Sequence, residues 1–282
     1  MPKSGNKFSV CDFFLYFWTT ETYKDMKKIL ILIVVALAQQ SAFAWGRLGH
    51  ETVIKIAERH LTEKTKANIA KYMPYDLKTD AVWMDRHRWD DEYAYTGRWH
   101  GCHVDPVTCK YDMDRSAAND DIVRGMEVVE HNLRNYKNLT DSAVNMNLKL
   151  ILHMVGDMHC PVHNHYGRKE MWACTLNGEP YKKFHTVYDR MPQLVHGDIA
   201  PELLAEQLDT YSKSEIRKAQ KGGYEDWIFD CASQCKILYE WNPFDTEVLN
   251  PKTVELSAEL VDTQLRNAGY RLAYLLNLYF GK

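Results

Sequence analysis

A run of histidines around one carboxylate, His-Met-Val-Gly-Asp-Met-His-Cys-Pro-Val-His, spans residues 153–163. It follows an apolar segment that predicts a long helix ended by Pro161, because proline cannot continue a helix. On that helix His153 and Asp157 are four positions apart and project from one face, with His163 just past the break. Such groups are costly to bury unless a partner binds them. The run therefore predicts a divalent metal site rather than a core helix with satisfied histidines.

Two other segments offer the same kinds of donor atom. His100 follows Asp85 by fifteen positions, and Arg88 lies one helical turn beyond Asp85, where it can point to the same place. The alternative for this segment is a solvated charge cluster on an amphipathic turn. His185 and Asp189 form a second histidine–aspartate pair four positions apart. Two histidine–aspartate pairs with this spacing are less expected by chance than one, so the residues of both pairs are candidate metal ligands.

The first part of the chain has the pattern of a leader. Residues 26–44 contain two lysines, a short apolar run and a small-residue Ala-Phe-Ala end, which together predict a secretory signal peptide. The apolar run is too short for a membrane span. Cleavage would leave residues 45–282 as the mature chain. Residues 1–25 precede a second methionine and are interpreted as a mis-assigned upstream extension. We therefore expect an exported protein, periplasmic or extracellular.

The predicted cleavage has a chemical consequence at Trp45. A free α-amine has a pKa of about 7.7–8.0, low enough for a metal to displace its proton. The amine and its own carbonyl oxygen would form a five-membered chelate, with His50 five residues further on. The alternative is that Trp45 is a buried anchor for the terminus.

The composition describes a globular chain with a core. Its 282 residues are 45% hydrophobic and 26% charged, and the formal net charge is −3. This balance excludes a generally basic protein that coats nucleic acid, but it allows a local cationic site. Six cysteines follow the leader, and an even count in an exported chain favours disulfides, namely among Cys102, Cys109, Cys160, Cys174, Cys231 and Cys235.

Helical patterns dominate residues 45–282, and strand signals are scarce. A helix capped by Thr140, Asp141 or Ser142 should carry the 153–163 run. Residues 164–183 are irregular, with turn signals and at most one hairpin. Residues 253–280 carry a core-facing apolar stripe. The other expected segments are helices at 51–61, 120–135, 201–220 and 225–241 and a loop at 105–118.

Taken together, these residues resemble the zinc-dependent single-strand nucleases of the S-one/P-one type, over essentially all of residues 45–282. The family's pattern is an N-terminal Trp with a nearby His, a Trp-x-Asp, a His fifteen positions on, a His-xxx-Asp-x-His-x-Pro-x-His and a His-xxx-Asp. The resemblance implies one mainly α-helical domain with a cleft for three Zn²⁺ ions. By position, the first ion would be held by the Trp45 amine and carbonyl, His50 and Asp157. The second would be held by Asp85, His100, His153 and the bridging Asp157, and the third by His163, His185 and Asp189.

The resemblance also implies an activity. A secreted endonuclease of this kind hydrolyses single-stranded DNA and RNA to 5′-phosphate products, and it is also a 3′-nucleotidase. Two zinc ions sharing Asp157 lower the pKa of a water. The third ion and Arg88 would clamp the phosphate oxygens and the leaving 3′-oxygen. The candidate catalytic residues are thus Asp85, Arg88 and Asp157, in a chain expected to be a monomer. His159 is read as a core or supporting residue, because it points away from the His153 face.

The departures from the family pattern concern substrate binding. His103 stands where the family often has an aspartate that grips the base, although it could instead replace His100 as a ligand. The family's Asp-x-Gly-Gly-Asn loop is replaced by residues 166–172. Here Trp172, Tyr166 or Tyr181 could stack on a base, and Arg168 or Lys169 could meet a phosphate, unless these are ordinary loop residues. The resemblance also suggests a Cys109–Cys235 disulfide, and Cys160–Cys174 is a second candidate pair.

Two other functions fit part of the pattern. Exported zinc-dependent phospholipase C uses a similar metal cluster, but it has Glu in the last pair and a shorter gap before it, whereas this chain has Asp189. A non-catalytic zinc-binding protein would account for the altered base site. Retention of Arg88 and of every ligand position argues against that alternative.

Overall fold

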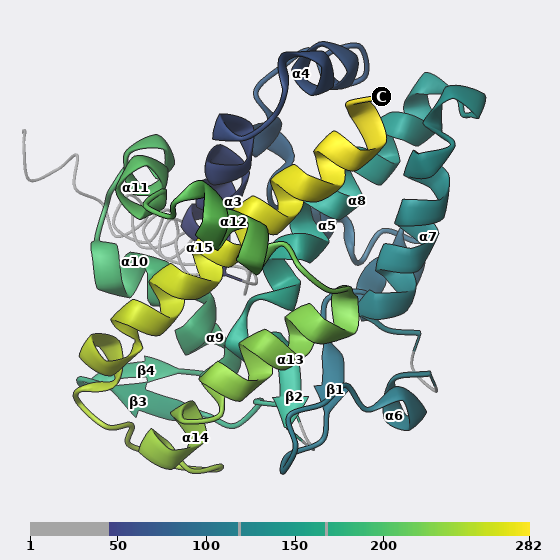
Figure 1. Ribbon diagram of the computed structural model, residues 1–282. Helices are drawn as coiled ribbons and strands as arrows, with labels where there is room; N and C mark the ends of the chain where they lie inside the picture. Colours follow the sequence, from purple (N-terminus) through teal and green to yellow (C-terminus); the bar gives the residue numbers. More distant parts are fainter. Residues whose placement is uncertain (1–44, 118–119, 167–168) are drawn as a thin grey trace, which may run out of the picture. The chain divides into compact units, whose positions relative to one another are not determined.

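The computed structural model describes residues 45–117, 120–166 and 169–282 (Figure 1). The predicted upstream extension (1–25), the predicted signal peptide (26–44) and Arg168 lie outside the described residues. Within them helices predominate and every strand is short, which confirms the mainly α fold class. No helix in this part of the chain combines the length and the apolarity that crossing a bilayer requires.

The secondary structure is as follows. The α-helices are α3 (Gly46–Arg59), α4 (Glu63–Ile69), α5 (Trp83–His87), α6 (Met113–Ala117), α7 (Ile122–Arg134), α8 (Asp141–Met158), α9 (Phe184–Asp189), α10 (Met191–His196), α11 (Pro201–Leu208), α12 (Lys213–Ala219), α13 (Tyr224–Cys235), α14 (Leu238–Trp241) and α15 (Thr253–Phe280). The 3₁₀ turns are η1 (Leu77–Asp80), η2 (Ala94–Arg98), η3 (Tyr136–Asn138) and η4 (Pro161–His163). The strands are β1 (Cys102–Val104), β2 (Asn164–Tyr166), β3 (Cys174–Leu176) and β4 (Glu179–Tyr181).

The core is built around the long C-terminal helix α15, which runs beside α3 and α8 (Figure 1). It also packs against α10 and α4. Its predicted apolar stripe is buried from Val261 to Tyr279 and partly buried at the first two positions. A helix with one continuous apolar face is stabilised by burying it against neighbours, so α15 supports α3 and α8, two of the helices that carry candidate site residues.

Helix α8 matches its prediction closely. The Thr140 side chain accepts a hydrogen bond from the backbone N–H of Ala143 at 3.2 Å and so caps the first turn. The helix ends at Met158, and Pro161 then opens the turn η4. Every residue from 150 to 158 is buried. The polar side chains of this last stretch must therefore find partners inside the protein.

Two predicted helices are interrupted. The segment 201–220 divides into α11 and α12, because Ser212 and Glu215 form a capping box that starts a new helix. The segment 225–241 divides into α13 and α14. The segment 105–118, expected to be a loop, contains the short helix α6. Local capping and short connections decide where these helices begin and end, and the hydrophobic pattern of the sequence does not predict those boundaries.

The strands form two separate pairs. The antiparallel pair β3–β4 is the predicted hairpin, turning at Asn177 and Gly178, which both have positive φ. The parallel pair β1–β2 was not foreseen; it places His103 opposite His165. Parallel pairing of strands far apart in the chain leaves no local sequence signal. This pair is nevertheless what joins the segment containing His100 to the segment containing His163.

The six cysteines of the described chain are all free and buried. The predicted bridges Cys109–Cys235 and Cys160–Cys174 are therefore absent, and both predictions are wrong for this structure. The sulfur of Cys235 faces Cys231 one turn earlier on α13, at 3.7 Å, whereas a disulfide requires about 2.05 Å.

Candidate metal centre and pocket

Asp157, near the end of α8, is the point on which the candidate ligands converge. Its Oδ2 lies 2.9 Å from His100 Nδ1 and 3.2 Å from His153 Nε2. Its Oδ1 lies 3.3 Å from Nε2 of His50 on α3. His50, His153 and Asp157 are fully buried and form one group with the spacing to hold a metal ion. The predicted bridging carboxylate is thus central in space as well as in sequence.

A second group of the same kind is completed by Asp85 on α5. Its carboxylate oxygens lie 3.7 Å from His100 Nδ1 and 3.6 Å from His153 Nε2. Asp85, His100 and His153 together could hold a second ion. The guanidinium of Arg88 lies 3.9 Å from the Asp85 carboxylate. Arg88 therefore stands at the edge of this group, as its one-turn spacing from Asp85 predicts.

A third group surrounds Asp189 on α9. Its Oδ1 lies 3.5 Å from His185 Nε2 and 3.9 Å from His163 Nε2. The compact set here is His163, Asp189 and the thiol of Cys160, which was not a predicted donor. The ring of His163 lies 4.7 Å from that of His185, so all three predicted members are close together. His163 Nδ1 also donates a hydrogen bond to the His100 carbonyl oxygen, which links this group to the other two.

Trp45 lies at the start of α3 and is fully buried. Its carbonyl oxygen accepts the first helical hydrogen bond from Gly49, at 3.1 Å. The backbone of the next residue, Gly46, packs against the carbonyl oxygen of Asp189. Burial agrees with the anchor interpretation of Trp45. Chelation through a free amine remains a prediction.

The candidate ligands have polar atoms without hydrogen-bond partners in the described part of the chain. Buried polar groups are normally paired, so a concentration of unpaired ones in one place needs an explanation. Nitrogen and carboxylate-oxygen donors are the atoms that zinc binds. The residues present therefore fit a metal centre. The unpaired atoms are Nδ1 and Nε2 of His50, Oδ2 of Asp85, Nε2 of His100, Oδ1 of Asp157, Nε2 of His163, Nδ1 of His185 and both oxygens of Asp189.

The charges in the centre are strongly coupled. Burial opposes ionisation of Asp157, but the imidazoles of His153, His163 and His100 outweigh it and hold the pKa of this carboxyl well below its usual value. Burial likewise works to lower the pKa of His153, yet Asp157 and Asp85 raise it to about 9. Burial raises the pKa of Asp189 to about 7. Without cations, part of this site is compensated by protons.

Gly156 fixes the position of His50, because a Cβ at residue 156 would lie 2.5 Å from His50 Nδ1. We expect Gly156→Ala to displace the imidazole and to lower hydrolytic activity by about 10- to 100-fold. This loss should occur although alanine is favoured over glycine in a helix by about 1 kcal/mol. Steady-state kinetics and metal analysis would measure the effect. Gly223→Ala, where a Cβ meets no atom within 4 Å, is the matched control.

His159 is directed away from the metal centre. Its Nε2 accepts a hydrogen bond from Arg271 at 2.8 Å, and its Nδ1 donates to the Val155 carbonyl oxygen at 2.7 Å. Arg271 also binds Asp230 at 2.9 Å. Both ring nitrogens are thus occupied, Nδ1 by the backbone of α8 and Nε2 by Arg271 of α15. This geometry supports the reading of His159 as a core residue.

The reading of His159 can be tested by substitution. We expect His159→Gln to retain the metal content of the wild type and to lose about 1–3 kcal/mol of unfolding free energy, because a buried Arg271 donor loses its partner. Denaturant unfolding and elemental analysis would measure the two quantities. Loss of one bound ion with unchanged stability would instead make His159 a ligand.

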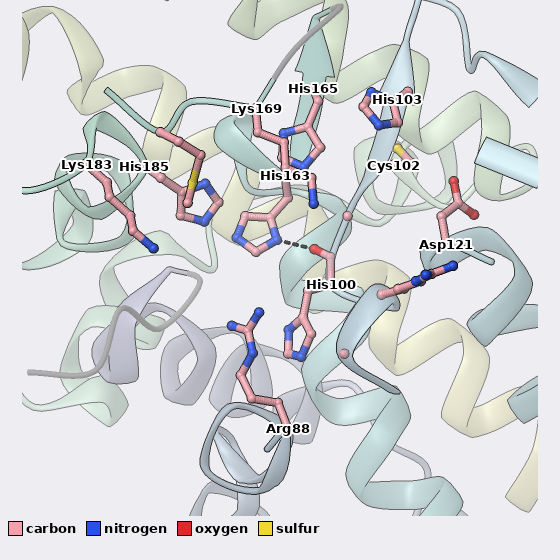
Figure 2. Close-up of a pocket in the computed structure, with 14 residues that line it drawn as sticks. Arg88, His100, Cys102, His103, Asp121, His163, His165, Lys169, Lys183 and His185 are labelled. Carbon is pink, nitrogen blue, oxygen red and sulfur yellow. Dashed lines mark hydrogen bonds between the residues drawn. The ribbon is translucent and has the colours of Figure 1, made fainter. Parts of the chain in front are cut away.

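A cavity of about 410 Å³ opens above the centre (Figure 2). Figure 2 shows Arg88 reaching into it toward His100 and His163. Asp121 is the one carboxylate among its described lining residues. The cavity is therefore of the size that takes a small ligand, and its walls favour an anion. The cationic lining side chains are Arg88, Arg98, Lys169 and Lys183, and the lining imidazoles are His100, His103, His163, His165 and His185.

The predicted substrate-binding residues divide into two sets. His103 and Lys169 line the cavity. Trp172 does not: its ring stacks on Phe184 at 4.5 Å and its indole N–H donates to the Thr246 carbonyl oxygen, which corrects the expectation that it faces substrate. The other two candidate stacking residues, Tyr166 and Tyr181, are buried and are not among the cavity-lining residues. Aromatic residues of this loop region hold the fold together because a small domain needs them in its core.

Among the cationic and imidazole side chains that line the cavity, three were not predicted from the sequence: Arg98, His165 and Lys183. The signal for His165 was its spacing of two from His163, which places both side chains on the same side if the chain is extended. Lys183 immediately precedes α9 and offered no motif. The buried carboxylate of Glu170, which binds His165 Nδ1 at 2.7 Å, was also missed.

Buried nitrogen and carboxylate donors beneath a cationic cavity define the class of metal-dependent hydrolases of phosphate esters. Comparison with known proteins gives the family. The model of the S1/P1 Nuclease family matches residues 45–281. The chain therefore belongs to the S1/P1 nuclease family, and it is a nuclease, a hydrolase acting on ester bonds. The match does not favour the phospholipase C alternative.

Individual relatives match most of the length of the chain. Nuclease S1 of Aspergillus oryzae is 25% identical, over 90% of this chain and 98% of its own. Endonuclease 4 of Arabidopsis thaliana is 28% identical, over 88% and 93%. Nuclease P1 of Penicillium citrinum is 21% identical, over 84% and 98%. The family match over residues 45–281 includes all the segments that contribute to the candidate centre.

Proposed function

We propose that this chain is an exported, monomeric, zinc-dependent endonuclease, formed by one domain over residues 45–282. It hydrolyses single-stranded DNA and RNA to 5′-phosphate products and removes the phosphate of 3′-nucleotides. The observation that carries the proposal is the convergence of ligands from four segments below a cavity that Arg88 enters. His50 of α3, His100 before β1 and His153 of α8 surround Asp157, and Asp85 of α5 lies beside His100 and His153. The start of the family match at Trp45 supports the predicted cleavage site.

Three zinc ions would be held by the residues already described. Their chemistry is to acidify a water and to neutralise the charge of the phosphate. The assignment gives Trp45, His50 and Asp157 to one ion, and Asp85, His100, His153 and Asp157 to a second. The third ion has His163, His185 and Asp189, with Cys160 close enough to join them.

The protein's own contribution is to position the phosphate. Arg88 offers a planar fork of donors that matches two phosphate oxygens, and Asp85 lies near enough to hold that fork in place. His163 binds the carbonyl oxygen of His100 and so fixes the backbone at the cavity floor. A base in a duplex would have to leave its stack before its phosphate reached this floor. These features support a preference for single strands.

A panel of substrates tests the proposal. The mature protein should cleave single-stranded DNA, RNA and 3′-AMP, should cleave duplex DNA far more slowly, and should leave lecithin intact. A chelator should stop all hydrolysis, and zinc should restore it. Turnover of lecithin alone would support a phospholipase. Three bound zinc ions without hydrolysis of any phosphoester would support a non-catalytic zinc protein.

The N-terminal ligand gives a separate prediction. A protein that keeps one additional residue before Trp45 lacks the free α-amine at the chelating position. We expect it to bind one zinc ion fewer and to lose activity by about 100-fold or more, because the ion beside Asp157 is weakened. Elemental analysis and kinetics before and after removal of the extra residue by an aminopeptidase would measure this. Equal zinc content in both forms would show that the Trp45 amine is not a ligand and that Trp45 is a buried anchor.

A further inference from the structure

The wall of the cavity on the side of β2 and α9 has no role in the proposed metal chemistry. It contains His103, His165, Lys169 and Lys183. Figure 2 shows Lys169 beside His163 and His165, and Lys183 beside His185. The charge of Lys169 acts on His103 and that of Lys183 acts on His185, so both ammonium groups lie close to the cavity imidazoles. This arrangement gathers nitrogen donors around one space.

Lys169 and Lys183 are cationic side chains with no carboxylate paired to them in the part of the chain that the structure describes. Neither Lys169 nor Lys183 forms an ion pair within the described ranges of the chain, whereas four other lysines do, among them Lys55 with Glu58 and Asp76. Ammonium groups at the mouth of a cavity raise the local potential and attract anions. The positive charge of this wall therefore favours the binding of an anion.

His165 is held rigidly in this wall. It is 8% exposed, and its Nδ1 lies 2.7 Å from Oε2 of Glu170, which is fully buried. The other oxygen of Glu170 accepts a hydrogen bond from Tyr239 at 2.7 Å, and its backbone carbonyl accepts one from His185 at 2.9 Å. Because Nδ1 is occupied, Nε2 is the ring nitrogen left for a ligand, beside the lining residue Gly101. A buried carboxylate that orients an imidazole in this way is a feature of built binding sites.

We propose that this wall, formed by His103, His165, Lys169 and Lys183, is a second phosphate subsite. It would bind the phosphate adjacent to the one being cleaved, so that the preferred substrate is a nucleotide unit with phosphates at both its 3′ and 5′ positions. The proposal rests on the proposed function, since the phosphate at the metal centre defines where the second one lies. Recognition would then depend on the spacing of two phosphates more than on the identity of the base between them.

Two sources could supply the second phosphate, a terminal 5′-phosphate or an internal phosphodiester. The substrates that separate them are 3′-AMP, adenosine 3′,5′-bisphosphate, the dinucleotide ApA and its 5′-phosphorylated form pApA. We expect the bisphosphate to exceed 3′-AMP, and pApA to exceed ApA, by about 10- to 100-fold in kcat/KM, as one or two charge-assisted hydrogen bonds would give. A longer strand lacking a 5′-phosphate should be cleaved well only at internal positions.

Lysine substitutions locate the subsite. Lys169→Gln and Lys183→Gln should each lower the ratio of the bisphosphate kcat/KM to the 3′-AMP kcat/KM by about 3- to 10-fold, and the double variant should bring this ratio close to 1. Lys182→Gln is the matched control, because Lys182 is the exposed neighbour of Lys183 and does not line the cavity. It should leave the ratio unchanged. An unchanged ratio in the double variant would overturn the proposal.

Calorimetric measurement of the affinities of the same two nucleotides for the zinc-loaded protein tests the phosphate subsite separately from the proposed function. Binding of the bisphosphate about 10-fold tighter than 3′-AMP, lost in the double variant, supports the subsite whether or not turnover occurs. Equal affinities overturn it. Absence of hydrolysis of every phosphoester overturns the proposed function instead, so the two failures are distinguishable.

Discussion

Asp157→Asn should reduce hydrolysis of single-stranded DNA by roughly 10³-fold or more. The Asp157 carboxylate lies within 3.3 Å of imidazole nitrogens from three different segments, at His50, His100 and His153. It is the group that two of the proposed ions share. An amide keeps the volume but removes the negative charge, so the cations lose the ligand that holds them together. Initial rates and metal content per chain should fall together.

The control for this substitution lies on the same helix. Asp141→Asn changes an exposed carboxylate in the first turn of α8, where a favourable helix-end charge contributes less than about 1 kcal/mol. It should leave both rate and metal content near wild type. If Asp157→Asn retained three ions and at least a tenth of the rate, the shared carboxylate would not be the centre of the mechanism.

Removal of the metal should lower the melting temperature by roughly 10 °C for each tightly bound ion. An ion present at about 1,000 times its Kd stabilises the folded state by about 4 kcal/mol. One kcal/mol corresponds to about 2–4 °C for a chain of this size. In addition, Asp157 and Asp189 are almost wholly buried and lose their compensation. Thermal unfolding with and without a chelator, followed by stepwise return of zinc, would measure the shift.

The Asp157→Asn protein serves as the control for this effect. Because its metal centre should already be empty or weakly filled, the chelator should change its melting temperature by only a few degrees. Equal shifts in wild type and variant would mean that the chelator acts elsewhere. A wild-type protein that melts at the same temperature with and without chelator would exclude a stabilising role for the centre.

The sequence by itself determined the parts of the site that depend on helical periodicity. His153 and Asp157 are four positions apart within an apolar run, and His185 and Asp189 are four positions apart, so each pair shares a helix face in the structure. The capping residue Thr140 and the break before Pro161 also follow from local chemistry. These features could be predicted because each depends on contacts between neighbours in the chain.

Tertiary structure alone decided which of these faces meet. His50 reaches Asp157 because α3 packs so closely on α8 that only a glycine fits at position 156. The parallel pair β1–β2 sets His103 against His165, and Glu170 orients His165 from a segment that has no motif. Trp172 turned into the core, and the cysteines did not pair as expected. Contacts between segments distant in the chain depend on side-chain shape and on strand partners, neither of which leaves a periodic signal in the sequence.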